Sequence, residues 1–339
     1  MARSDVILDL GAVRRNARTL LAALEGAELW AVVKADGYGH GAVDVGGAAL
    51  GAGAAALCVA TVPEGLALRQ ALGAVRVLVM GPATSREIAD ARDAGLELVV
   101  ADGEIPEGVR VHLKLDTGMG RWGLAELPAP SREVVGLMSH FASADSDTAF
   151  TQRQLERFAA ATAEYSHLTR HIANSAAALR YPAARFDAAR CGIALYGISP
   201  FGTDPTGDGL EPALRWESHL AQVRLAQPGE STGYGRRWIA ERPTWLGIVP
   251  VGYADGFRRD LTGTEVRVAG ELRPVVGTIS MDAFAVALDR ELPVGAPVTL
   301  LGYGVQAEAH ARVAETIGYE IVTGIRSSPD RARRSVVDG

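Results

Sequence analysis

Several common sequence features are scarce in this chain, and their scarcity narrows its possible functions. Among 339 residues there are two cysteines, and aromatic residues make up 6% of the total. Cys58 and Cys191 both lie in apolar runs, so we expect buried free thiols in a reducing compartment rather than a disulfide. The net charge is −6 and no basic cluster carries interleaved aromatic residues, which argues against a nucleic-acid partner.

No segment has the sequence of a membrane span or of an export signal. The weakly polar stretch at residues 42–60 is interrupted by Asp44 and by glycines, so it is unsuited to crossing a bilayer. The N-terminus lacks the apolar region of a signal peptide. We therefore expect a cytoplasmic protein without a membrane partner.

Several motifs that define other enzyme classes are also absent. The chain has neither a Walker sequence nor a Gly-x-Ser-x-Gly elbow. The glycines at 51 and 53 follow a predicted helix and precede a strand, which is the reverse of a dinucleotide-binding turn. His167 and His171 have a spacing that could bind a metal on a helix, but they lie on a predicted strand with no Glu between them, so we expect no metal site.

The pattern of apolar runs predicts an α/β fold with two domains. Eight short runs recur, most of them separated by helix-like segments, at residues 29–33, 56–60, 76–80, 96–100, 109–115, 134–140, 167–174 and 188–196. This alternation is typical of a (β/α)8 barrel, with a doubly wound open sheet as the main alternative. Beyond residue 213 the runs become short, β-prone and closely spaced, which predicts a mainly antiparallel β domain with one helix at 310–317. The expected domains are residues 1–213 and 214–339.

Polar residues stand at the ends of the predicted barrel strands. Lys34, Asp116, Arg121, His140 and Asn174 all lie at or just beyond the C-terminal ends of different runs. Catalytic groups of barrel enzymes gather at this end of the strands, which favours the barrel over the open sheet.

Lys34 stands in the most informative stretch, Val-Val-Lys34-Ala-Asp-Gly-Tyr38-Gly-His40-Gly. An apolar strand that ends at a lysine and enters a glycine-rich loop is where an imine-forming lysine would be placed. Such a lysine must be neutral near pH 7, which requires its pKa to fall by roughly 3 units from about 10.4 through burial and neighbouring cations. The alternative is a lysine whose amine simply extends from the strand end into water.

Other motifs support a site at the same end, although each also has a purely structural explanation. Asn174-Ser175 before an Ala-rich segment suits a phosphate at a helix N-terminus, or a simple N-cap at Ser175. Arg190 lies within an apolar run, where a buried charge requires a partner. The segment Val-Gly-Tyr253-Ala-Asp-Gly is a strand that enters a tight turn, which either projects a phenol or packs an aromatic ring.

Together these motifs resemble the alanine racemase family, whose members bind pyridoxal phosphate in an N-terminal barrel followed by a β domain. The resemblance extends from about residue 6 to 325. It rests on the lysine stretch above and on six further motifs, namely Lys114-Leu-Asp-Thr-Gly-Met-Gly-Arg121, His140-Phe-Ala, Asn174-Ser175, Arg190-x-Gly-Ile-Ala-Leu-Tyr-Gly, Val-Gly-Tyr253-Ala-Asp-Gly and Met281-Asp282.

The resemblance implies a two-base racemisation of L- and D-alanine. Lys34 would bind the cofactor and act as one base, and Tyr253 from the partner subunit of a homodimer would act as the base on the opposite face. His140 would lie between Arg190 and Tyr253, and Arg190 would face the pyridine nitrogen. Two bases on opposite faces of a carbon allow inversion, whereas a single base would mostly return the proton to the same side.

The resemblance also implies the binding residues. The phosphate would lie among Tyr38, Ser175, Gly192 and Ile193, with Asn174 beside it. Arg121 and the backbone N–H of Met281 would hold the substrate carboxylate, and Lys114 matches a lysine that is often carbamylated in the family.

The chain departs from the family pattern at several places. The connections at 101–108 and 122–132 are too short for two of the outer barrel helices, and Ser327 lies near the position where many relatives carry a phosphate-binding tyrosine. Ala283 stands where glutamine is common, and Cys191 replaces the usual proline or aromatic residue. The alternatives are therefore a serine or broad-specificity racemase and a catalytically poor homologue that binds pyridoxal phosphate or a cycloserine-like inhibitor.

Overall fold

The computed structural model describes residues 2–339, which form two compact units. One unit comprises Val13–Phe201 and Thr206–Glu211, and the other comprises the chain up to Ala12, Gly202–Pro205 and Pro212–Gly339. We expected the first residues to belong to the barrel domain. They lie in the other unit instead, because β1 (Asp5–Asp9) pairs with two strands of that unit, at residues 214–217 and 333–337.

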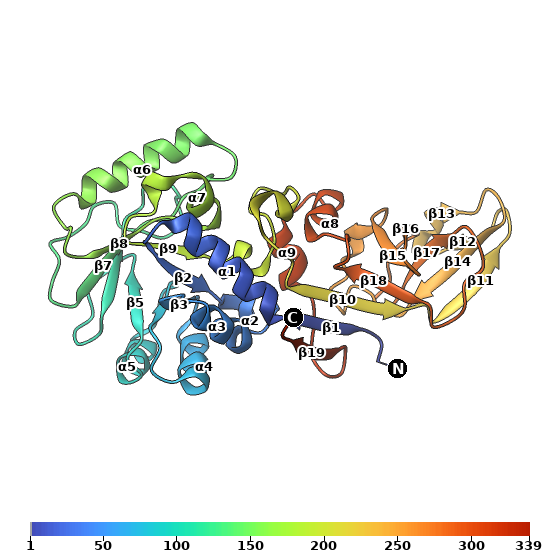
Figure 1. Cartoon of the computed structure of the whole chain (residues 1–339), viewed down its shortest axis with the longest axis horizontal. Helices are drawn as coiled ribbons and strands as arrows, with labels where there is room; N and C mark the ends of the chain where they lie inside the picture. The colour runs from blue at the N-terminus through green and yellow to red at the C-terminus, as the bar shows by residue number, and fades with distance from the viewer. Residues whose placement is uncertain (1) are drawn as a thin grey trace. The chain divides into compact units, whose positions relative to one another are not determined.

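The first unit is a barrel of eight strands in which every neighbouring pair is parallel (Figure 1). The strands are β2 (Glu28–Val32), β3 (Ala56–Val59), β4 (Val77–Val79), β5 (Glu97–Val100), β6 (Val111–Lys114), β7 (Val134–Met138), β8 (Thr169–His171) and β9 (Ala188–Cys191). Their order is β8-β7-β6-β5-β4-β3-β2-β9. The Arg190 N–H donates to the Ala173 carbonyl at 3.0 Å, which joins the segments that contain β9 and β8. The predicted barrel is confirmed, and the open sheet is wrong.

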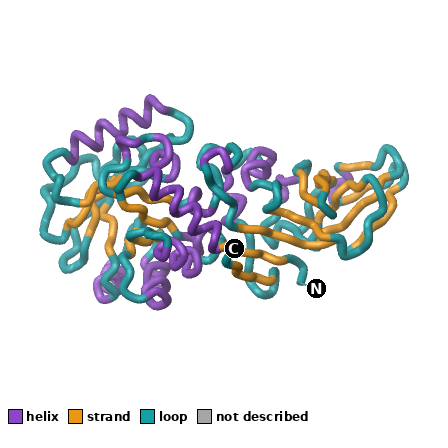
Figure 2. Tube along the Cα trace, in the orientation of Figure 1, coloured by secondary structure: helices purple, strands orange, loops and turns teal. Residues whose placement is uncertain are grey.

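Helices surround these strands (Figure 2). They are α1 (Leu10–Leu24), α2 (Lys34–Tyr38), α3 (Ala42–Gly51), α4 (Val62–Leu72), α5 (Ser85–Asp93), α6 (Thr148–Thr162) and α7 (Ser175–Arg180), with short 3-10 turns at Pro182–Ala184, Ile193–Tyr196 and Pro205–Asp208. Capping boxes of Thr61 with Glu64 and of Thr84 with Glu87 begin α4 and α5. Residues 101–110 and 115–133 contain no helix, as their length predicted.

The barrel strands are buried at almost every residue, yet their interior is not purely apolar. Glu97, His112, His171 and Arg190 are each at most 3% exposed and lie on β5, β6, β8 and β9. Because buried ionisable groups require partners, this polar chain within the barrel is central to the site.

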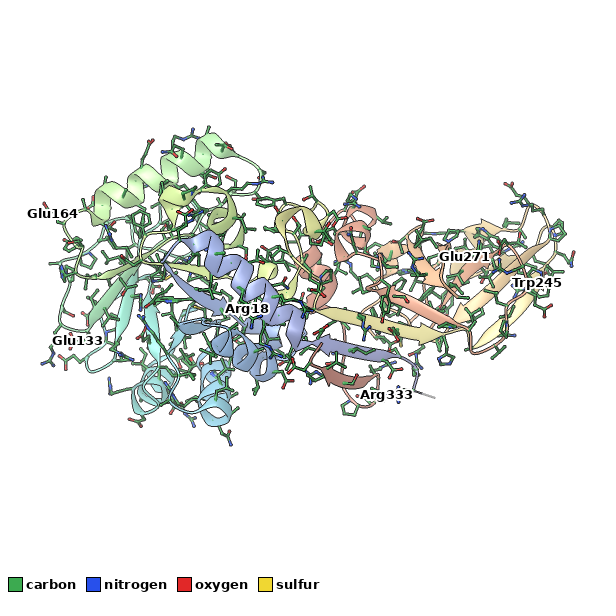
Figure 3. The ribbon with its side chains drawn as sticks, viewed as in Figure 1. Arg18, Glu133, Glu164, Trp245, Glu271 and Arg333 are labelled. Atoms are coloured by element: carbon green, nitrogen blue, oxygen red, sulfur yellow. The ribbon has the colours of Figure 1, made fainter. Side chains whose placement is uncertain are left out.

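The second unit is a sheet of nine strands. They are β1, β10 (Leu214–His219), β11 (Gln222–Ala226), β14 (Thr244–Val249), β15 (Glu265–Val268), β16 (Glu271–Val276), β17 (Phe284–Leu288), β18 (Pro297–Leu301) and β19 (Arg333–Val337), and β12 (Ser231–Thr232) and β13 (Trp238–Ile239) form a separate pair. All neighbours are antiparallel except β1 and β19, where Arg333 (labelled in Figure 3) forms an ion pair with Asp5. The mainly antiparallel domain is thus confirmed.

The helices of the second unit differ from the sequence-based expectation. Two helices, α8 (Ala307–Val313) and α9 (Gly318–Thr323), replace the single helix predicted at 310–317, and two 3-10 turns lie at Tyr234–Arg236 and Arg259–Leu261. Nowhere in residues 2–339 is there a helix with both the length and the apolar character needed to cross a membrane.

Candidate active site

Lys34 lies just after β2, at the first residue of an unusual turn. Ala35, Asp36, Gly37 and Tyr38 all have φ between 50° and 60°, so the chain follows a left-handed path that only glycine adopts without cost. Two carboxylates hold this turn. Asp36 accepts the Ala42 N–H at 2.9 Å, and Glu64 accepts the Ala35 N–H at 2.7 Å. A strained segment that is held at several points fixes the position of the preceding lysine.

The surroundings of Lys34 favour its neutral form. Burial, together with the charges of Arg121 and Arg190, lowers the pKa of Lys34, while the Glu64 carboxylate opposes this shift. A lysine with a lowered pKa is a better nucleophile and base near neutrality.

Arg190 is buried on β9 and donates to groups on the neighbouring strands. One terminal nitrogen donates to His171 Nδ1 at 2.6 Å and the other to the Ser139 carbonyl at 2.8 Å. The second nitrogen also donates to His140 Nδ1 at 3.0 Å. Burial lowers the pKa of Arg190 to about 10, so it remains charged at neutral pH.

The bond from Arg190 determines which nitrogen of His140 carries the hydrogen. Because arginine only donates, Nδ1 of His140 must accept, and in the neutral ring the hydrogen is on Nε2. Burial and the charges of Arg190 and Arg121 lower the pKa of His140 well below its usual value, which keeps the ring neutral. The structure therefore brings Lys34, Arg121, His140 and Arg190 into one electrostatic environment.

A second group of predicted residues surrounds Gly192. Ser175 Oγ accepts the Gly192 N–H at 3.0 Å, and a Cβ atom at residue 192 would approach Tyr38 Oη to 2.4 Å. Ile193 begins the 3-10 turn that follows. Asn174, rather than Ser175, caps α7 by accepting the Ala177 N–H at 3.0 Å, so the N-cap reading of Ser175 is wrong. The hydroxyl of Ser175 instead lies at the turn of residues 192–194.

Lys114 and Arg121 lie on either side of a short loop and contact the same indole. Lys114 Nζ is 5.7 Å and the Arg121 guanidinium carbon 5.4 Å from the centre of the Trp122 ring. The Asp116 carboxylate organises the loop by accepting N–H groups of residues 118–120. Burial and the Arg121 charge lower the pKa of Lys114 to about 8.

Tyr253 and Met281 belong to the other unit, where their two loops are joined. The Tyr253 N–H donates to the Ser280 carbonyl at 3.1 Å, and the Ala254 N–H donates to the Met281 carbonyl at 3.0 Å. Both side chains are exposed, at 44% for Tyr253 and 51% for Met281. The Tyr253 phenol is therefore exposed on a loop that hydrogen bonds hold in place, and it is accessible to groups outside its own unit.

Sequence reasoning missed several residues that organise these groups. Glu97 and His112 were hidden in apolar runs, Trp122 was noted only as part of the short connection at 122–132, and Asp255 was part of the Tyr253 motif without a role of its own. His171 was weighed as a metal ligand, but the structure places it against Arg190. A charged or polar residue within a predicted buried strand was the available signal for Glu97 and His112.

The fold and the polar groups at the strand ends define an enzyme of the (β/α)8-barrel class. Residues 8–200 match the family model described as "Alanine racemase, N-terminal domain", and residues 213–333 match that described as "Alanine racemase, C-terminal domain". The chain therefore belongs to the alanine racemase family.

Relatives and solved structures agree with this assignment along the whole chain. The alanine racemase of Symbiobacterium thermophilum is 39% identical, with 94% of this chain and 93% of that protein covered. The alanine racemase of Lactiplantibacillus plantarum is 38% identical, with 95% of each chain covered. The structure of the biosynthetic alanine racemase from Pseudomonas aeruginosa superposes with a TM-score of 0.92 at 36% identity, covering 99% of this chain and all of that one. The chain is an enzyme of the racemase class.

Proposed function

We propose that this enzyme interconverts L- and D-alanine with pyridoxal phosphate, using Lys34 and Tyr253 as its two bases. The observation that carries the proposal is the position of Lys34, whose lowered pKa, strand-end location and held turn suit a lysine that alternates between bonding and proton transfer. The alanine racemases that it resembles over nearly its full length support alanine as the substrate.

The residues around Gly192 fit the phosphate of this cofactor. A side chain at residue 192 would clash with the Tyr38 hydroxyl, so the glycine keeps this space clear of a Cβ atom. The hydroxyls of Tyr38 and Ser175 and the backbone N–H groups of Gly192 and Ile193 would hold the phosphate, with Asn174 beside them, because hydroxyl and amide donors suit its oxygens. The Gly192 N–H would then exchange its bond to Ser175 Oγ for one to the phosphate. Lys34 would hold the other end of the cofactor.

When bound, pyridoxal phosphate supplies an aldehyde that bonds to amines and a ring that accepts the electron pair left by the departing α-proton. Lys34 takes or returns the proton on one face of the substrate α-carbon, and Tyr253 of the partner subunit does so on the other face. Arg190 would meet the ring nitrogen and, because it stays charged, would leave that nitrogen unprotonated. His140, with its hydrogen on Nε2, has an N–H available to donate to the phenol oxygen of Tyr253.

Arg121 and the Met281 N–H would bind the substrate carboxylate, with Lys114 as a supporting group. Within residues 2–339, neither Lys114 nor Arg121 forms an ion pair with a carboxylate, although the Asp116 charge raises the pKa of Lys114 and so partly opposes its lowering. A lysine whose pKa is about 8 has a substantial neutral fraction at mildly basic pH, and the neutral amine is the form that adds CO2. A carbamate on Lys114 would supply the missing anion beside Arg121.

The proposed mechanism requires two copies of the chain, because the two bases come from different subunits. We therefore propose a homodimer with shared sites, located in the cytoplasm, where D-alanine would enter peptidoglycan synthesis. Cys58 and Cys191 are both buried and free, which supports a reducing compartment.

The test is to incubate the purified enzyme and pyridoxal phosphate with L-alanine and to measure D-alanine. Borohydride reduction and peptide mapping should place a pyridoxyl group on Lys34, and the Lys34→Ala variant should lack both the label and the activity. A labelled Lys34 without racemisation of either L-alanine or L-serine would identify the catalytically poor homologue. No label at any lysine would refute the cofactor assignment.

The departures at Ala283 and Cys191 keep one alternative open, a serine or broad-specificity racemase. Apolar pockets discriminate weakly against one added hydroxyl. Comparing kcat/KM for L-alanine and L-serine on the same preparation distinguishes the two. A ratio near one would favour the broad enzyme.

A further inference from the structure

A continuous chain of hydrogen bonds passes through the barrel interior and ends at Arg190. His112 Nε2 lies 2.9 Å from Glu97 Oε2, and His112 Nδ1 lies 2.8 Å from His171 Nε2. His171 Nδ1 then accepts from Arg190 at 2.6 Å. We call Glu97, His112 and His171 the interior relay; all three are at most 1% exposed.

The two ends of the relay determine the position of every hydrogen in it. Arg190 can only donate, so His171 Nδ1 accepts and the hydrogen of that neutral ring is on Nε2. His171 therefore donates to His112 Nδ1, and His112 donates from Nε2 to the Glu97 carboxylate. Each bond holds one hydrogen only if both rings are neutral and Glu97 is ionised.

The charges around the relay agree with this arrangement. Burial and the positive charge of Arg190 lower the pKa of His171 well below its usual value. Burial lowers the pKa of His112, although the bond to Glu97 opposes the shift. Burial alone would raise the pKa of Glu97, but the bonds from His112 and Arg76 outweigh it and the pKa is lowered.

Arg190 needs such a remote partner, because within residues 2–339 no carboxylate contacts it. Its nearby Cys58 and Cys191 thiols stay neutral, since burial raises the pKa of each to about 12. Glu97 is the carboxylate at the far end, and Arg76 and Arg110 hold it at 3.0 and 3.3 Å.

The packing around the relay leaves it little freedom. The Trp30 ring contacts both histidine rings, with centroids 5.6 Å from His112 and 4.5 Å from His171. A Cβ atom at Gly136 would come within 2.2 Å of His112 Nδ1, so only glycine fits there. These packing contacts, unlike the bond from Arg190, involve no residue assigned to the substrate or the cofactor.

We propose that Glu97 is a positioning residue for Arg190, which it orients through His112 and His171 by imposing one pattern of hydrogens on both rings. This inference rests on the proposed role of Arg190 at the cofactor ring. It assigns a function to three buried residues that do not touch the substrate.

Glu97→Gln is the sharpest test, because an amide has one acceptor oxygen, whereas the two carboxylate oxygens now serve His112, Arg76 and Arg110. With the amide oxygen at the position of Oε1, where it accepts from both arginines, the NH2 group faces His112 and both rings must reverse their hydrogens. Nδ1–H of His171 would then oppose the N–H of Arg190. We expect kcat to fall about 10-fold or more, since bonds to charged groups are involved, with KM for alanine changed less than about 3-fold.

Two further variants separate positioning from general damage. Glu28→Gln is the matched control, because Glu28 also pairs with Arg76, at 3.6 Å, but contacts neither histidine. The amide keeps an oxygen that can accept the Trp30 N–H, as Glu28 now does at 2.7 Å. The kcat of this variant should stay within about 2-fold of the unmodified enzyme, as expected for a partly exposed ion pair. Gly136→Ala should displace His112 without changing any charge, and should lower kcat as Glu97→Gln does.

The second readout is the 15N NMR spectrum of the holoenzyme labelled with 15N-histidine, which reports the tautomer of each ring and needs no turnover. The proposal predicts hydrogens on Nε2 of His112 and His171, and a reversed His171 ring in Glu97→Gln. Unchanged kcat in Glu97→Gln, or lower kcat with unchanged tautomers and an equal loss in Glu28→Gln, would overturn it. If the unmodified enzyme forms no D-alanine, the proposed function fails while the tautomers still test the relay.

Discussion

Glu64 accepts the backbone N–H of Ala35 at 2.7 Å, directly after Lys34. The other oxygen of the same carboxylate accepts the N–H groups of Ala60 and Thr61, at 2.8 and 3.1 Å. One side chain thereby joins the end of β3 and the start of α4 to the left-handed turn after β2. The residue that caps a helix also holds the lysine turn.

We expect Glu64→Gln to weaken this junction and to change the acidity of Lys34. The amide has one acceptor oxygen, so at least one backbone donor loses its partner, at a cost of about 1–3 kcal/mol in the free energy of unfolding. Removing the negative charge should lower the pKa of Lys34 further, since Glu64 now raises it. The measurement is the pH dependence of pyridoxal phosphate binding to Lys34 in the cofactor-free enzyme, with Glu87→Gln, another capping-box residue, as the control.

Asp255 should position the Tyr253 loop in the second unit. Its buried carboxylate accepts the Gly252 N–H at 2.9 Å and pairs with Arg3 and Arg331, each at 3.4 Å. Both arginines also reach Asp282, next to Met281. Segments from near both ends of the chain thus hold the loops of Tyr253 and Met281.

Asp255→Asn should therefore lower kcat more than cofactor affinity, because the phenol loses its support while Lys34 lies in the other unit. Because the substitution weakens the buried hydrogen bonds and ion pairs of Asp255, the free energy of unfolding should also fall by about 1–3 kcal/mol. Steady-state kinetics and fluorescence titration with pyridoxal phosphate measure the two effects. Asp282→Asn removes an exposed carboxylate from the same arginines and should change little; a larger effect there than at Asp255 would contradict the prediction.

A carbamate on Lys114 should form as the pH rises through about 8. The neutral amine adds CO2 and releases a proton, so at constant dissolved CO2 the occupancy increases as the lysine loses its proton. With 13C-bicarbonate, the holoenzyme should show a carbamate 13C signal that is absent from Lys114→Ala. An identical signal in that variant would assign the carbamate to another amine.

The lowered pKa of Lys114 should also make the stability of the protein depend on pH when this lysine carries no carbamate. Between pH 8 and 10.5, unfolded Lys114 would hold a proton that the folded residue has lost. The unfolded state binds more protons in this window, so the free energy of unfolding should rise with pH there. The Lys114→Met variant should lack this part of the rise in urea titrations made without bicarbonate.

The sequence was sufficient for the barrel because each strand carried its own signal. Apolar runs, helix-start residues and the polar residues after several of the runs are local features, and they located Lys34, Arg121 and His140 on the correct end of the strands. The sequence did not predict that β1 belongs to the second unit. Asp5–Asp9 pair with Arg333–Val337, which lie at the opposite end of the chain. No local pattern specifies such a partner.

The interior relay was missed for a different physical reason. Hydrophobic periodicity identifies Glu97, His112 and His171 as members of buried strands but says nothing about which side chains meet across the barrel. His112 is 15 residues from Glu97 and 59 residues from His171 in the sequence. The Trp122 ring likewise has no motif of its own, and only the fold brings Lys114 and Arg121 to it.

The shared site can be tested with two inactive variants. Lys34→Ala lacks one proposed base and Tyr253→Phe lacks the other, so neither homodimer should racemise alanine. In a mixed dimer, the intact Lys34 of one subunit would face the intact Tyr253 of its partner at one site, and the second site would lack both. After subunit exchange, random pairing gives roughly half mixed dimers and so roughly one quarter of the unmodified activity.

The outcome distinguishes a shared site from one formed within a single chain. If Lys34 and Tyr253 of the same chain served one site, each site of a mixed dimer would lack one base and mixing would restore nothing. The control mixes two different variants of the same unit, Lys34→Ala and Arg190→Ala, whose lesions both lie in the barrel. Every site of that mixture has one defective barrel and should be inactive. Activity in this control would show that the activity restored in the first mixture does not depend on Tyr253 of the partner subunit.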